Sequence, residues 1–389
     1  MARYRLGSIC QIISGSTPKT GVQEYWNGDK KWITPAELSE SDYIIYDTER
    51  KLTEAGVRSA GLTPLPKGTV ILSSRAPIGK VAIAGCEMYC NQGFKNFVCS
   101  NIINNKYLYW YLRSKTDFLN SLGRGATFKE ISKSTVADIE LDIPELSEQS
   151  KRVAHLEKLQ SIIASRRIQL AKLDELVKCR FVELFGITNE YARFPVLRLH
   201  ELCKNADDIK CGPFGTQLNK EEYQTAGVPI WEIPQINSNF AIPPVHFISN
   251  EKAHLLRFYD AVSGDIIMSR KGKVGMCTIF PNNVAPGVIH SDVLRIRLNE
   301  EKASNIFICA LFRYSWDVEN QLARISMGAI MPGVNVTKLK QLQVIVPPLN
   351  LQQTFAVFVR RIDKLRIVIR QSLDEAQKLF DSLMQEYFD

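Results

Sequence analysis

The sequence has no run of apolar residues long enough to cross a membrane. A membrane-spanning helix needs roughly 18 or more apolar residues in succession, and no apolar run among these 389 residues approaches that length. The first ten residues, MARYRLGSIC, also lack the apolar segment of a signal peptide. We therefore expect a cytoplasmic protein that makes no membrane contact.

Histidine and cysteine are present, but not in patterns that hold a metal or a disulfide framework. The five histidines show no paired spacing, and the nine cysteines are irregularly spaced and odd in number. Cys86 and Cys90 are the closest cysteine pair, but no second pair stands at zinc-ligand spacing. We expect reduced cysteines, no metal site and no bound cofactor.

Catalytic motifs are missing as well. The Pro-Pro pairs within 242–245 and 346–349 lack the amide or carboxylate and the aromatic residue with which a DNA adenine methyltransferase holds a flipped base. Residues 74–81, SRAPIGKV, come close to a phosphate-binding loop, but Ser74 replaces its first glycine and Val81 its hydroxyl residue. The sequence therefore predicts a protein that is not itself an enzyme.

The charge is mildly basic and is not concentrated in a tail. The formal net charge is +8 at pH 7. Such a balance permits an anionic partner without requiring one, since a slightly basic protein with no such partner would look the same. Any surface that binds nucleic acid must therefore form by folding rather than by a run of charge.

What the chain does contain is an internal repeat. Residues 68–83, GTVILSSRAPIGKVAI, align without a gap on residues 264–279, GDIIMSRKGKVGMCTI. Residues 125–149 align in the same way on residues 328–352. The matches fall in strand-like and helix-like segments, which indicates two copies of one folded unit.

The stretches between the matches differ, notably 15–60 against 210–260, where Trp32 falls near Trp231. A scaffold must be kept for the chain to fold, whereas loops are where binding is altered. Two domains with one scaffold and different loops are therefore expected. Gene duplication followed by drift without functional consequence is the alternative, and the long helices described next argue against it.

Each copy is followed by a segment with the pattern of one long helix. Residues 146–185 contain neither Gly nor Pro, and apolar residues after Pro348 alternate at spacings of three and four. This is a heptad seam, and each helix of about 40 residues would span about 60 Å. The residues expected in the seam are Leu156, Leu159, Ile163, Leu170, Leu173, Val177, Phe358, Ile362, Leu365, Ile369, Ala376 and Leu383.

Such helices are unstable alone, because an apolar stripe needs a partner. The order domain, helix, domain, helix favours an antiparallel coiled coil with one globular domain at each end, related by a pseudo-twofold axis. In the alternative, each helix packs on its own domain. The length of the stripe counts against that arrangement.

The fold class predicted for the globular copies is α+β, with a curved mixed sheet and short helices. Residues 105–114 and 305–314 are expected to be equivalent helices. The expected strands are 70–74, 81–85, 94–99, 139–144, 266–270, 276–280, 293–298 and 343–347. The expected division is a first domain at 1–145, a long helix at 146–186, a second domain at 187–346 and a long helix at 347–389.

Several segments carry a resemblance to a known family. They are LGSICQIISGSTPKT (6–20), YWNGDKKWITPAEL (25–38), ILSSRAPIGKVAI (71–83) and ADIELDIPELSEQ (137–149), with DIIMSRKGKVGMCTI (265–279) and LQVIVPPLNLQQ (342–353) in the second copy. Over essentially its whole length, the chain resembles the specificity subunit of a type I restriction–modification enzyme. The duplicated order carries this resemblance more than any single motif.

The resemblance implies two target-recognition domains that each read a few base pairs of double-stranded DNA, and hence a bipartite target. Because the two copies differ in their loops, we expect unlike half-sites and an asymmetric target. The helices would dock two methyltransferase (modification) subunits, which restriction (translocase) subunits would join. S-adenosylmethionine, ATP and Mg²⁺ would be bound by those partners. A single-chain restriction enzyme with an unrecognised catalytic site, or a coiled-coil scaffold that does not touch DNA, are the alternatives.

Candidate DNA contacts are the basic and amide residues of the duplicated loops, because phosphate contacts position a protein and base-edge contacts specify its target. Any one of them is equally well explained as a solvated surface charge, and the inference concerns the set. The candidates are Lys19, Lys30, Lys31, Arg75, Lys80, Lys95, Arg124, Lys129, Gln217, Arg270, Lys271, Lys273 and Arg324.

The helix length predicts the spacer between the two half-sites. Two domains that read one face of a duplex sit about one helical turn apart, roughly 34–36 Å. Inserting one helical turn, roughly four residues, into Ala164–Lys172 should lengthen the unspecified spacer and leave both half-sites unchanged, as sequencing of methylated sites would measure. An unchanged spacer would rule out this role for the helices.

Overall fold

The structure is a computed structural model, and it divides into two compact units. Unit 1 contains residues 1–167 and 371–389, and unit 2 contains residues 168–370. Each unit thus holds one globular copy together with part of each long helix. The domain boundaries predicted above follow the helix ends instead and stay a prediction. The structure describes residues 2–39, 42–125, 129–186, 193–271, 275–326 and 333–389.

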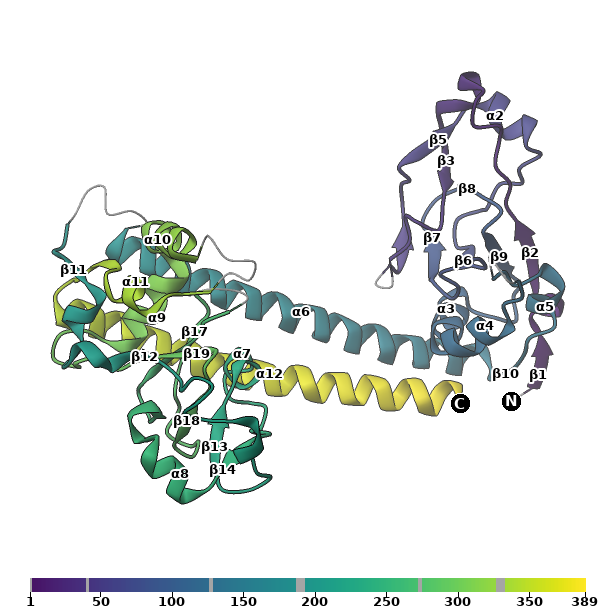
Figure 1. Ribbon diagram of the computed structural model, residues 1–389. Coiled ribbons are helices and arrows are strands. Elements are labelled where there is room, and N and C mark those ends of the chain that lie inside the picture. Colours follow the sequence, from purple (N-terminus) through teal and green to yellow (C-terminus); the bar gives the residue numbers. More distant parts are fainter. Residues whose placement is uncertain (1, 40–41, 126–128, 187–192, 272–274, 327–332) are drawn as a thin grey trace. The chain divides into compact units, whose positions relative to one another are not determined.

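The two long helices are α6, Leu146–Phe185, and α12, Leu349–Phe388. Each has 40 residues, close to the predicted length (Figure 1). In unit 1, His155 near the start of α6 lies 2.9 Å from the hydroxyl of Tyr387 near the end of α12. In unit 2, Arg366 of α12 pairs with Asp174 of α6 at 2.6 Å. Within each unit the helices therefore pack against each other in antiparallel directions, as predicted.

Most residues predicted for the helix seam are turned inward. Leu365 is the exception, with 51% of its surface exposed. Arg366, four residues after Ile362, is half-buried and contacts Asp174 of α6. The contact between the two helices is therefore made by Arg366, and Leu365 stays at the surface. Leu156, Ile163, Val177, Ile362 and Ala376 are buried, and Leu159, Leu170, Leu173, Phe358, Ile369 and Leu383 are half-buried.

The globular part of unit 1 contains two sheets that mix parallel and antiparallel pairs. The larger has the order β2-β9-β6-β7-β4, the smaller β5-β3-β8, and β1 pairs with β10 as a separate ribbon. β4 is parallel to β7, and β8 to β3. The strands are β1 Ala2–Arg5, β2 Cys10–Ser14, β3 Trp26–Ile33, β4 Ile44–Ile45, β5 Arg50–Leu52, β6 Val70–Ser73, β7 Val81–Ala84, β8 Tyr89–Cys90, β9 Phe94–Cys99 and β10 Glu140–Ile143.

Unit 2 repeats this arrangement. Its larger sheet has the order β12-β19-β16-β17, its smaller sheet β14-β13-β18-β15, and β11 pairs with β20. β18 is parallel to β13, as β8 is to β3. The strands are β11 Val196–Arg198, β12 Ile209–Cys211, β13 Val228–Trp231, β14 Phe247–Ile248, β15 Asp260–Ala261, β16 Ile266–Ser269, β17 Cys277–Ile279, β18 Gly287–Ile289, β19 Val293–Ile296 and β20 Gln343–Ile345.

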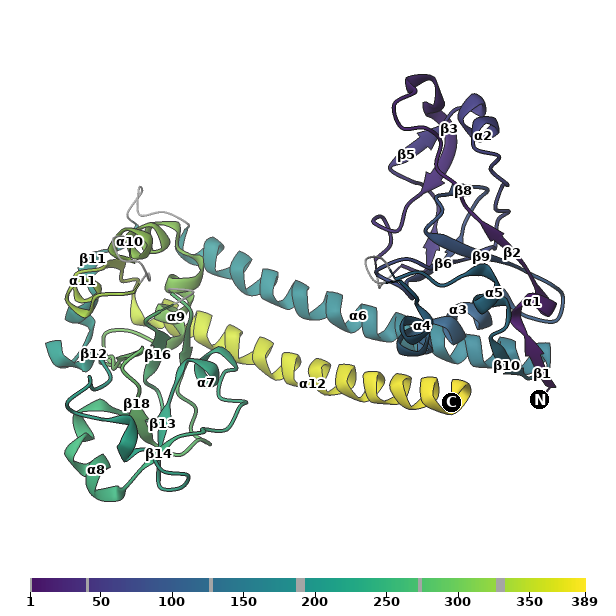
Figure 2. The same ribbon diagram turned by 45° about the vertical axis from the view of Figure 1, so that its right-hand side comes forward.

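Two of the short helices, α3 (Asn105–Ser114) and α9 (Asn305–Tyr314), contribute to the main hydrophobic cores of unit 1 and unit 2 respectively. Both match the predicted ranges. Each lies against the long helices, whereas the smaller sheet lies farther from them (Figures 1 and 2). The remaining helices are α1 Leu6–Ile9, α2 Glu54–Ser59, α4 Thr116–Leu122, α5 Lys133–Ala137, α7 Ile233–Asn237, α8 Asn250–Leu255, α10 Trp316–Ser326 and α11 Val336–Lys340.

The strands that carry Trp32 and Trp231 correspond with a shift of one residue from the alignment of the two tryptophans. The Asn91 amide donates to the carbonyl of Ile33 at 3.1 Å, and the His290 amide donates to the carbonyl of Trp231 at 2.9 Å. Trp231 is therefore the counterpart of Ile33 rather than of Trp32. A shift of one residue turns a strand side chain to the opposite face, so the two tryptophans pack in different clusters.

A buried glutamine joins each globular copy to its long helix. In unit 2, Gln352 accepts from the Ser304 amide at 2.9 Å and donates to the Pro347 carbonyl at 2.8 Å. In unit 1, Gln149 makes the equivalent bonds to the Asn104 amide and the Pro144 carbonyl and a third to the Ile102 carbonyl. Both glutamine side chains are fully buried, so each amide makes its hydrogen bonds to the protein backbone rather than to water.

Replacing this amide should destabilise unit 2. Gln352→Ala leaves the Ser304 amide and the Pro347 carbonyl without a partner, which costs about 1–3 kcal/mol. The neighbouring Gln353 is exposed, so Gln353→Ala should change the free energy of unfolding by less than about 0.5 kcal/mol. Chemical denaturation of both variants measures the difference, and equal stabilities would contradict the role given to Gln352.

Candidate nucleic-acid interface

Loop segments meet at one end of the larger sheet in unit 1. The Ser74 amide, directly after β6, donates to the Gly93 carbonyl at 2.8 Å, and the Ile131 amide donates to the Ser74 carbonyl at 2.9 Å. The Ser16 amide, after β2, donates to the Cys90 carbonyl at 3.1 Å. We call these segments the first loop cluster: residues 15–19, 74–79, 91–93, 124–125 and 129–131.

Unit 2 builds the same cluster from the equivalent segments. The Arg270 amide donates to the Asp292 carbonyl at 2.8 Å, and the Val334 amide donates to the Arg270 carbonyl at 3.0 Å. Both bonds are main-chain bonds, like their counterparts in unit 1, so the side chains there are free to differ. The second loop cluster consists of residues 212–217, 270–271, 290–292 and 333–335.

A glycine begins the first segment of each cluster for the same reason. A Cβ atom at Gly15 would lie 2.1 Å from the carbonyl oxygen of Asn91, and one at Gly212 would lie 2.1 Å from that of Ile289. Neither approach leaves room for a side chain, because backbone atoms cannot move aside. The glycines therefore hold the loop after β2 or β12 against the turn that precedes β9 or β19.

One carboxylate joins two cations in the first loop cluster. Glu130 accepts from Arg75 Nε at 2.8 Å and from Lys95 Nζ at 3.1 Å. Burial alone would raise the pKa of this carboxyl, but the hydrogen bonds from Arg75 and Lys95 outweigh it and the pKa lies below its usual value. Lys19, Arg124 and Lys129 at the same cluster are exposed, so positive charge exceeds negative charge there.

The second loop cluster has its carboxylate on a different segment. Lys271, the counterpart of Arg75, pairs with Asp292 at 2.7 Å. Arg270 donates to the carbonyls of Val334 and Ser291, and its guanidinium lies 5.0 Å from the ring centre of Phe214. The two copies therefore present different side chains on the same backbone.

The structure brings only part of the predicted set together. Lys95 is 5% exposed and held by Glu130, so it lies inside the protein rather than at its surface. Lys30 and Lys31 lie on β3 of the smaller sheet, Lys80 Nζ is bonded to the Leu38 carbonyl, and Arg324 lies on α10. Lys273 lies outside the described residues. Those at the loop clusters are Lys19, Arg75, Arg124, Lys129, Gln217, Arg270 and Lys271.

Sequence reasoning missed an aromatic and cationic surface beside the second loop cluster. The ring of Phe258, 61% exposed, lies 4.9 Å from the Arg257 guanidinium and 5.6 Å from Lys210 Nζ. The Tyr259 hydroxyl donates to Gln217 Oε1 at 3.0 Å, which connects this surface to the cluster. The aromatic pair Phe258-Tyr259 directly after Arg257 is the sequence signal that would have found it.

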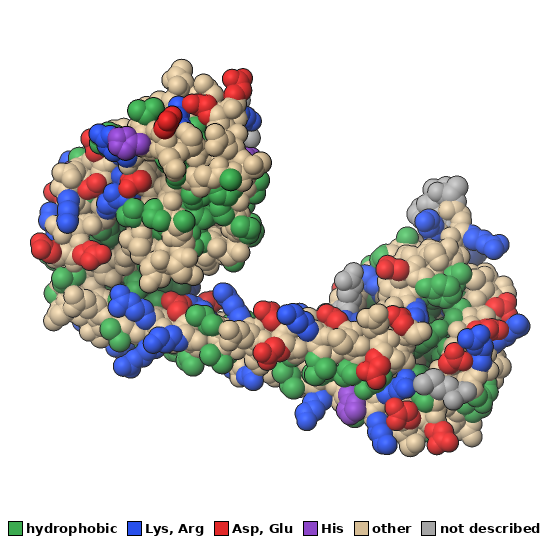
Figure 3. Space-filling view, turned by 90° about the horizontal axis from the view of Figure 1, so that it is seen from below, with side chains coloured by type: hydrophobic (Ala, Val, Ile, Leu, Met, Phe, Trp, Pro, Cys, Tyr) green, Lys and Arg blue, Asp and Glu red, His purple; other side chains and the backbone are tan. Residues whose placement is uncertain are grey.

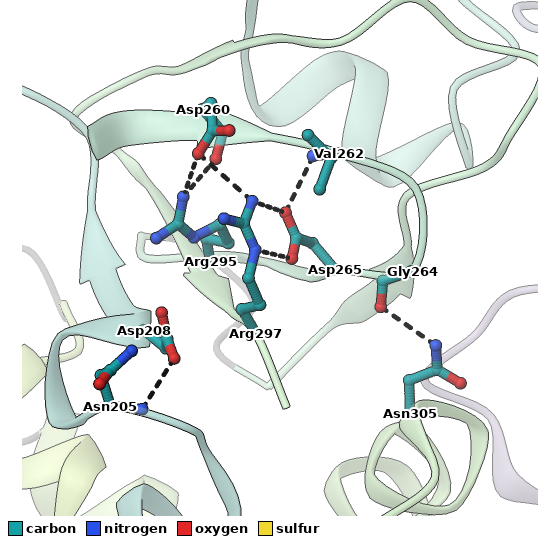
Figure 4. A network of polar contacts seen from close by, with 9 residues as sticks. All are labelled: Asn205, Asp208, Asp260, Val262, Gly264, Asp265, Arg295, Arg297 and Asn305. Atoms are coloured by element: carbon teal, nitrogen blue, oxygen red, sulfur yellow. Dashed lines mark hydrogen bonds and ion pairs between the residues drawn. The ribbon is translucent and has the colours of Figure 1, made fainter. Parts of the chain in front are cut away.

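Four charged residues join the larger and smaller sheets of unit 2 (Figure 4). Arg295 of β19 pairs with Asp260 of β15 at 2.6 Å. Arg297 holds both oxygens of Asp265, at 2.7 and 2.8 Å, and also contacts Asp260. The hydrogen bonds that Arg297 donates to Asp265 raise the pKa of Arg297 above its usual value despite partial burial. This network fixes the smaller sheet on the larger one.

The described residues contain no group of three side chains that could hold a metal ion. The described helices also include none that is long and apolar enough to span a membrane. On the face shown in Figure 3, Lys and Arg side chains alternate with Asp and Glu along the long helices. That face therefore carries no uniform basic field.

The comparisons with known proteins agree with the duplicated architecture. Residues 1–174 and 195–378 each match the family described as type I restriction modification DNA specificity domain, and the chain belongs to this family. It is 28% identical over 399 residues to the MjaIX type I specificity subunit of Methanocaldococcus jannaschii, covering 98% of this chain and 90% of that protein.

Two solved structures share the fold. The S subunit of a type I restriction–modification system from M. genitalium superimposes with a TM-score of 0.63 at 14% identity, covering 100% of this chain and 96% of that one. A chain from a structure concerned with complex assembly and conformational transition of the type I R-M system gives a TM-score of 0.62 at 16% identity, covering 100% and 97%.

Removing one member of the charged network should destabilise unit 2 strongly. Asp265 is buried, and Asp265→Ala removes both the bidentate partner of the half-buried Arg297 guanidinium and the acceptor of the Val262 amide, at a cost of roughly 3 kcal/mol. Asp207→Ala removes an exposed ion pair with Lys340 and should cost less than about 1 kcal/mol. Thermal and denaturant unfolding of the two variants compares them. Similar losses would mean that the network does not hold the sheets together.

Proposed function

We propose that this chain is the non-catalytic subunit that gives a type I restriction–modification complex its DNA specificity, acting in the cytoplasm. Each loop cluster would read one half-site of double-stranded DNA, and the helices would dock two methyltransferase subunits, which restriction subunits join. S-adenosylmethionine, ATP and Mg²⁺ would be bound by those partners. The observation that carries the proposal is one backbone framework, present twice, with different side chains on it.

An asymmetric bipartite target follows from this difference. The first loop cluster offers exposed lysine and arginine side chains, whereas the second offers Arg270, Phe214 and Gln217. Arg and Gln side chains suit guanine and adenine edges respectively, and each good bidentate contact is worth about 1–3 kcal/mol of discrimination. Because the two sets are unlike, the half-sites they would select are unlike as well.

The docking of partner subunits is supported by apolar side chains left at the surface of the long helices in unit 2. These side chains are between 46% and 62% exposed. Large apolar side chains that a helix pair leaves exposed are candidates for burial against a partner protein. We call them the helix patch: Ile168, Leu176, Leu365, Ile367 and Val368.

The proposal as a whole is tested by selection from random-sequence duplex DNA, with the methyltransferase subunit from the same organism added. Enrichment of two unlike sequence blocks at a fixed separation is expected. Binding of the partner without any enriched sequence would instead support the coiled-coil scaffold that the sequence left open.

A single exposed lysine of the first loop cluster should contribute to DNA affinity without affecting stability. If Lys129 contacts a phosphate, Lys129→Ala weakens binding to all sequences and reduces the slope of log affinity against log salt by about 0.9. Lys151, exposed on α6, is the matched control, and Lys151→Ala should leave the slope unchanged. Titrations at several salt concentrations measure both, and identical slopes would remove Lys129 from the interface.

A further inference from the structure

Unit 2 contains a cavity of about 380 Å³ between α9, β17 and the two long helices. Its walls are apolar where Ile279 and Ile306 line it, and three arginines, Arg313, Arg366 and Arg370, stand around it. The small side chains of Cys309, Ala310 and Val177 also line it. All of these residues belong to unit 2.

The equivalent place in unit 1 is filled by aromatic rings. The ring of Tyr43 lies 4.7 Å from that of Tyr109 and 5.9 Å from that of Trp110, and Phe380 packs on Trp110 at 5.6 Å. The Tyr43 hydroxyl donates to Glu157 of α6 at 2.5 Å. The side chain of Tyr43 therefore closes the space between the domain and the helix.

Three positions explain why the space is open in unit 2. α3 and α9 correspond at an offset of 200 residues, so Cys309 stands for Tyr109 and Ala310 for Trp110. The long helices correspond at an offset of 203, so Val177 stands for Phe380. At each position a large aromatic ring of unit 1 is replaced by a small side chain.

Aromatic pairs at the base of the same helices support this correspondence. Phe388 packs on Tyr107 at 5.3 Å in unit 1, and Phe185 packs on Phe307 at 4.7 Å in unit 2. These pairs obey the offsets of 203 and 200. The open space is therefore a local difference within an otherwise matching framework.

The strand that follows Tyr43, β4, also has no counterpart among the described residues of unit 2. In unit 1, β4 follows Tyr43 directly and lies parallel to β7, whose Ile83 amide donates to the Tyr43 carbonyl at 2.8 Å. In unit 2, β17 is the outermost strand of its sheet. An outermost strand presents unpaired backbone groups to which an extended segment can add.

The charges around the cavity define what such a segment would carry. Arg366 is paired with Asp174 and with Asp363, the one carboxylate among the residues that line the cavity. The described residues hold no carboxylate within ion-pair distance of Arg313 or Arg370, so the lining keeps a net positive charge. The segment that fills the space in unit 1, residues 42–49 with sequence DYIIYDTE, is acidic and aromatic. A segment of the same character would complement the arginines of unit 2.

We propose that the cavity of unit 2 and the outer edge of β17 bind an extended, acidic segment of the methyltransferase subunit. One aromatic side chain fills the cavity, and the backbone of the segment pairs with β17 as β4 pairs with β7. The site adjoins the helix patch, because Ile367 belongs to both. The identity of the partner rests on the proposed function. We call the cavity and the outer edge of β17 together the socket; unit 2 has this site, whereas in unit 1 the chain's own residues 42–49 fill the equivalent place.

The first test uses a synthetic peptide of residues 42–49 as the probe and the full chain as the receptor. Fluorescence anisotropy should detect saturable binding at one site, and replacing the tyrosine that corresponds to Tyr43 by alanine should weaken it about ten-fold. Arg370→Glu should weaken binding of the unchanged peptide similarly. Arg361→Glu, on the opposite side of α12, is the matched control. Absence of binding, or binding insensitive to these changes, overturns the proposal.

Closing the cavity from within gives a second, independent variant. Ala310→Trp restores the ring found at Trp110 in unit 1 and should abolish peptide binding. A thermal melt checks that Ala310→Trp folds. If it does not fold, the test rests on peptide binding by Arg370→Glu, which alters an exposed side chain. Unchanged peptide binding by a folded Ala310→Trp protein would contradict the proposal.

Binding of the methyltransferase subunit from the same organism separates this inference from the proposed function. Native mass spectrometry should count two subunits on the wild-type chain and fewer on Ala310→Trp or Arg370→Glu. Two subunits on every variant would overturn the socket and leave the proposed function standing. If the wild-type chain bound none, the proposed function would fail, and with it the identity given to the partner.

Discussion

The attachment of each globular copy to the pair of long helices is the contact on which the rest of the molecule depends. A buried glutamine side chain satisfies backbone groups from the start of a long helix and from the residues just before α3 or α9 at the same time. Aromatic packing from the end of the other long helix completes the contact. Because an unsatisfied buried backbone group is costly, helix and domain keep one relative geometry within each unit.

The elements that pack around this contact are the ones that could be predicted from the sequence. Periodicity and the absence of Gly and Pro define α6 and α12, and apolar runs define α3, α9 and the inner and neighbouring strands β6, β7, β9, β16, β17 and β19, because burial dictates those residue types. The strands β2, β4 and β12 of the larger sheets are not among those predicted. Spacing alone predicts Leu365 in the seam, but the structure leaves this side chain 51% exposed. From Ile362, a spacing of three leads to Leu365 and a spacing of four to Arg366. The partner helix decides between them, because Asp174 of α6 pairs with Arg366.

The candidate site was less predictable, for physical reasons. Lys95 looks like any other lysine in the sequence, and only the fold brings Ser74 and Glu130 to its ammonium group. The smaller sheets arise from short strands in the divergent stretches, where two or three residues give no periodic signal. Likewise, the open space beside α9 follows from three small residues that are distant in sequence, Val177, Cys309 and Ala310, and no local pattern reveals that they share a wall.

The loop clusters carry their geometry in main-chain bonds and their charges in side chains. Between the two copies, the carboxylate that neutralises the central cation has moved from Glu130 to Asp292, that is, from one loop to another, while the backbone bonds stayed in place. The fold of these loops and the chemistry of their surface are therefore carried by separate atoms. A lineage of such chains could change the charge of this surface by exchanging side chains, one compensated pair at a time, without passing through an unfolded intermediate.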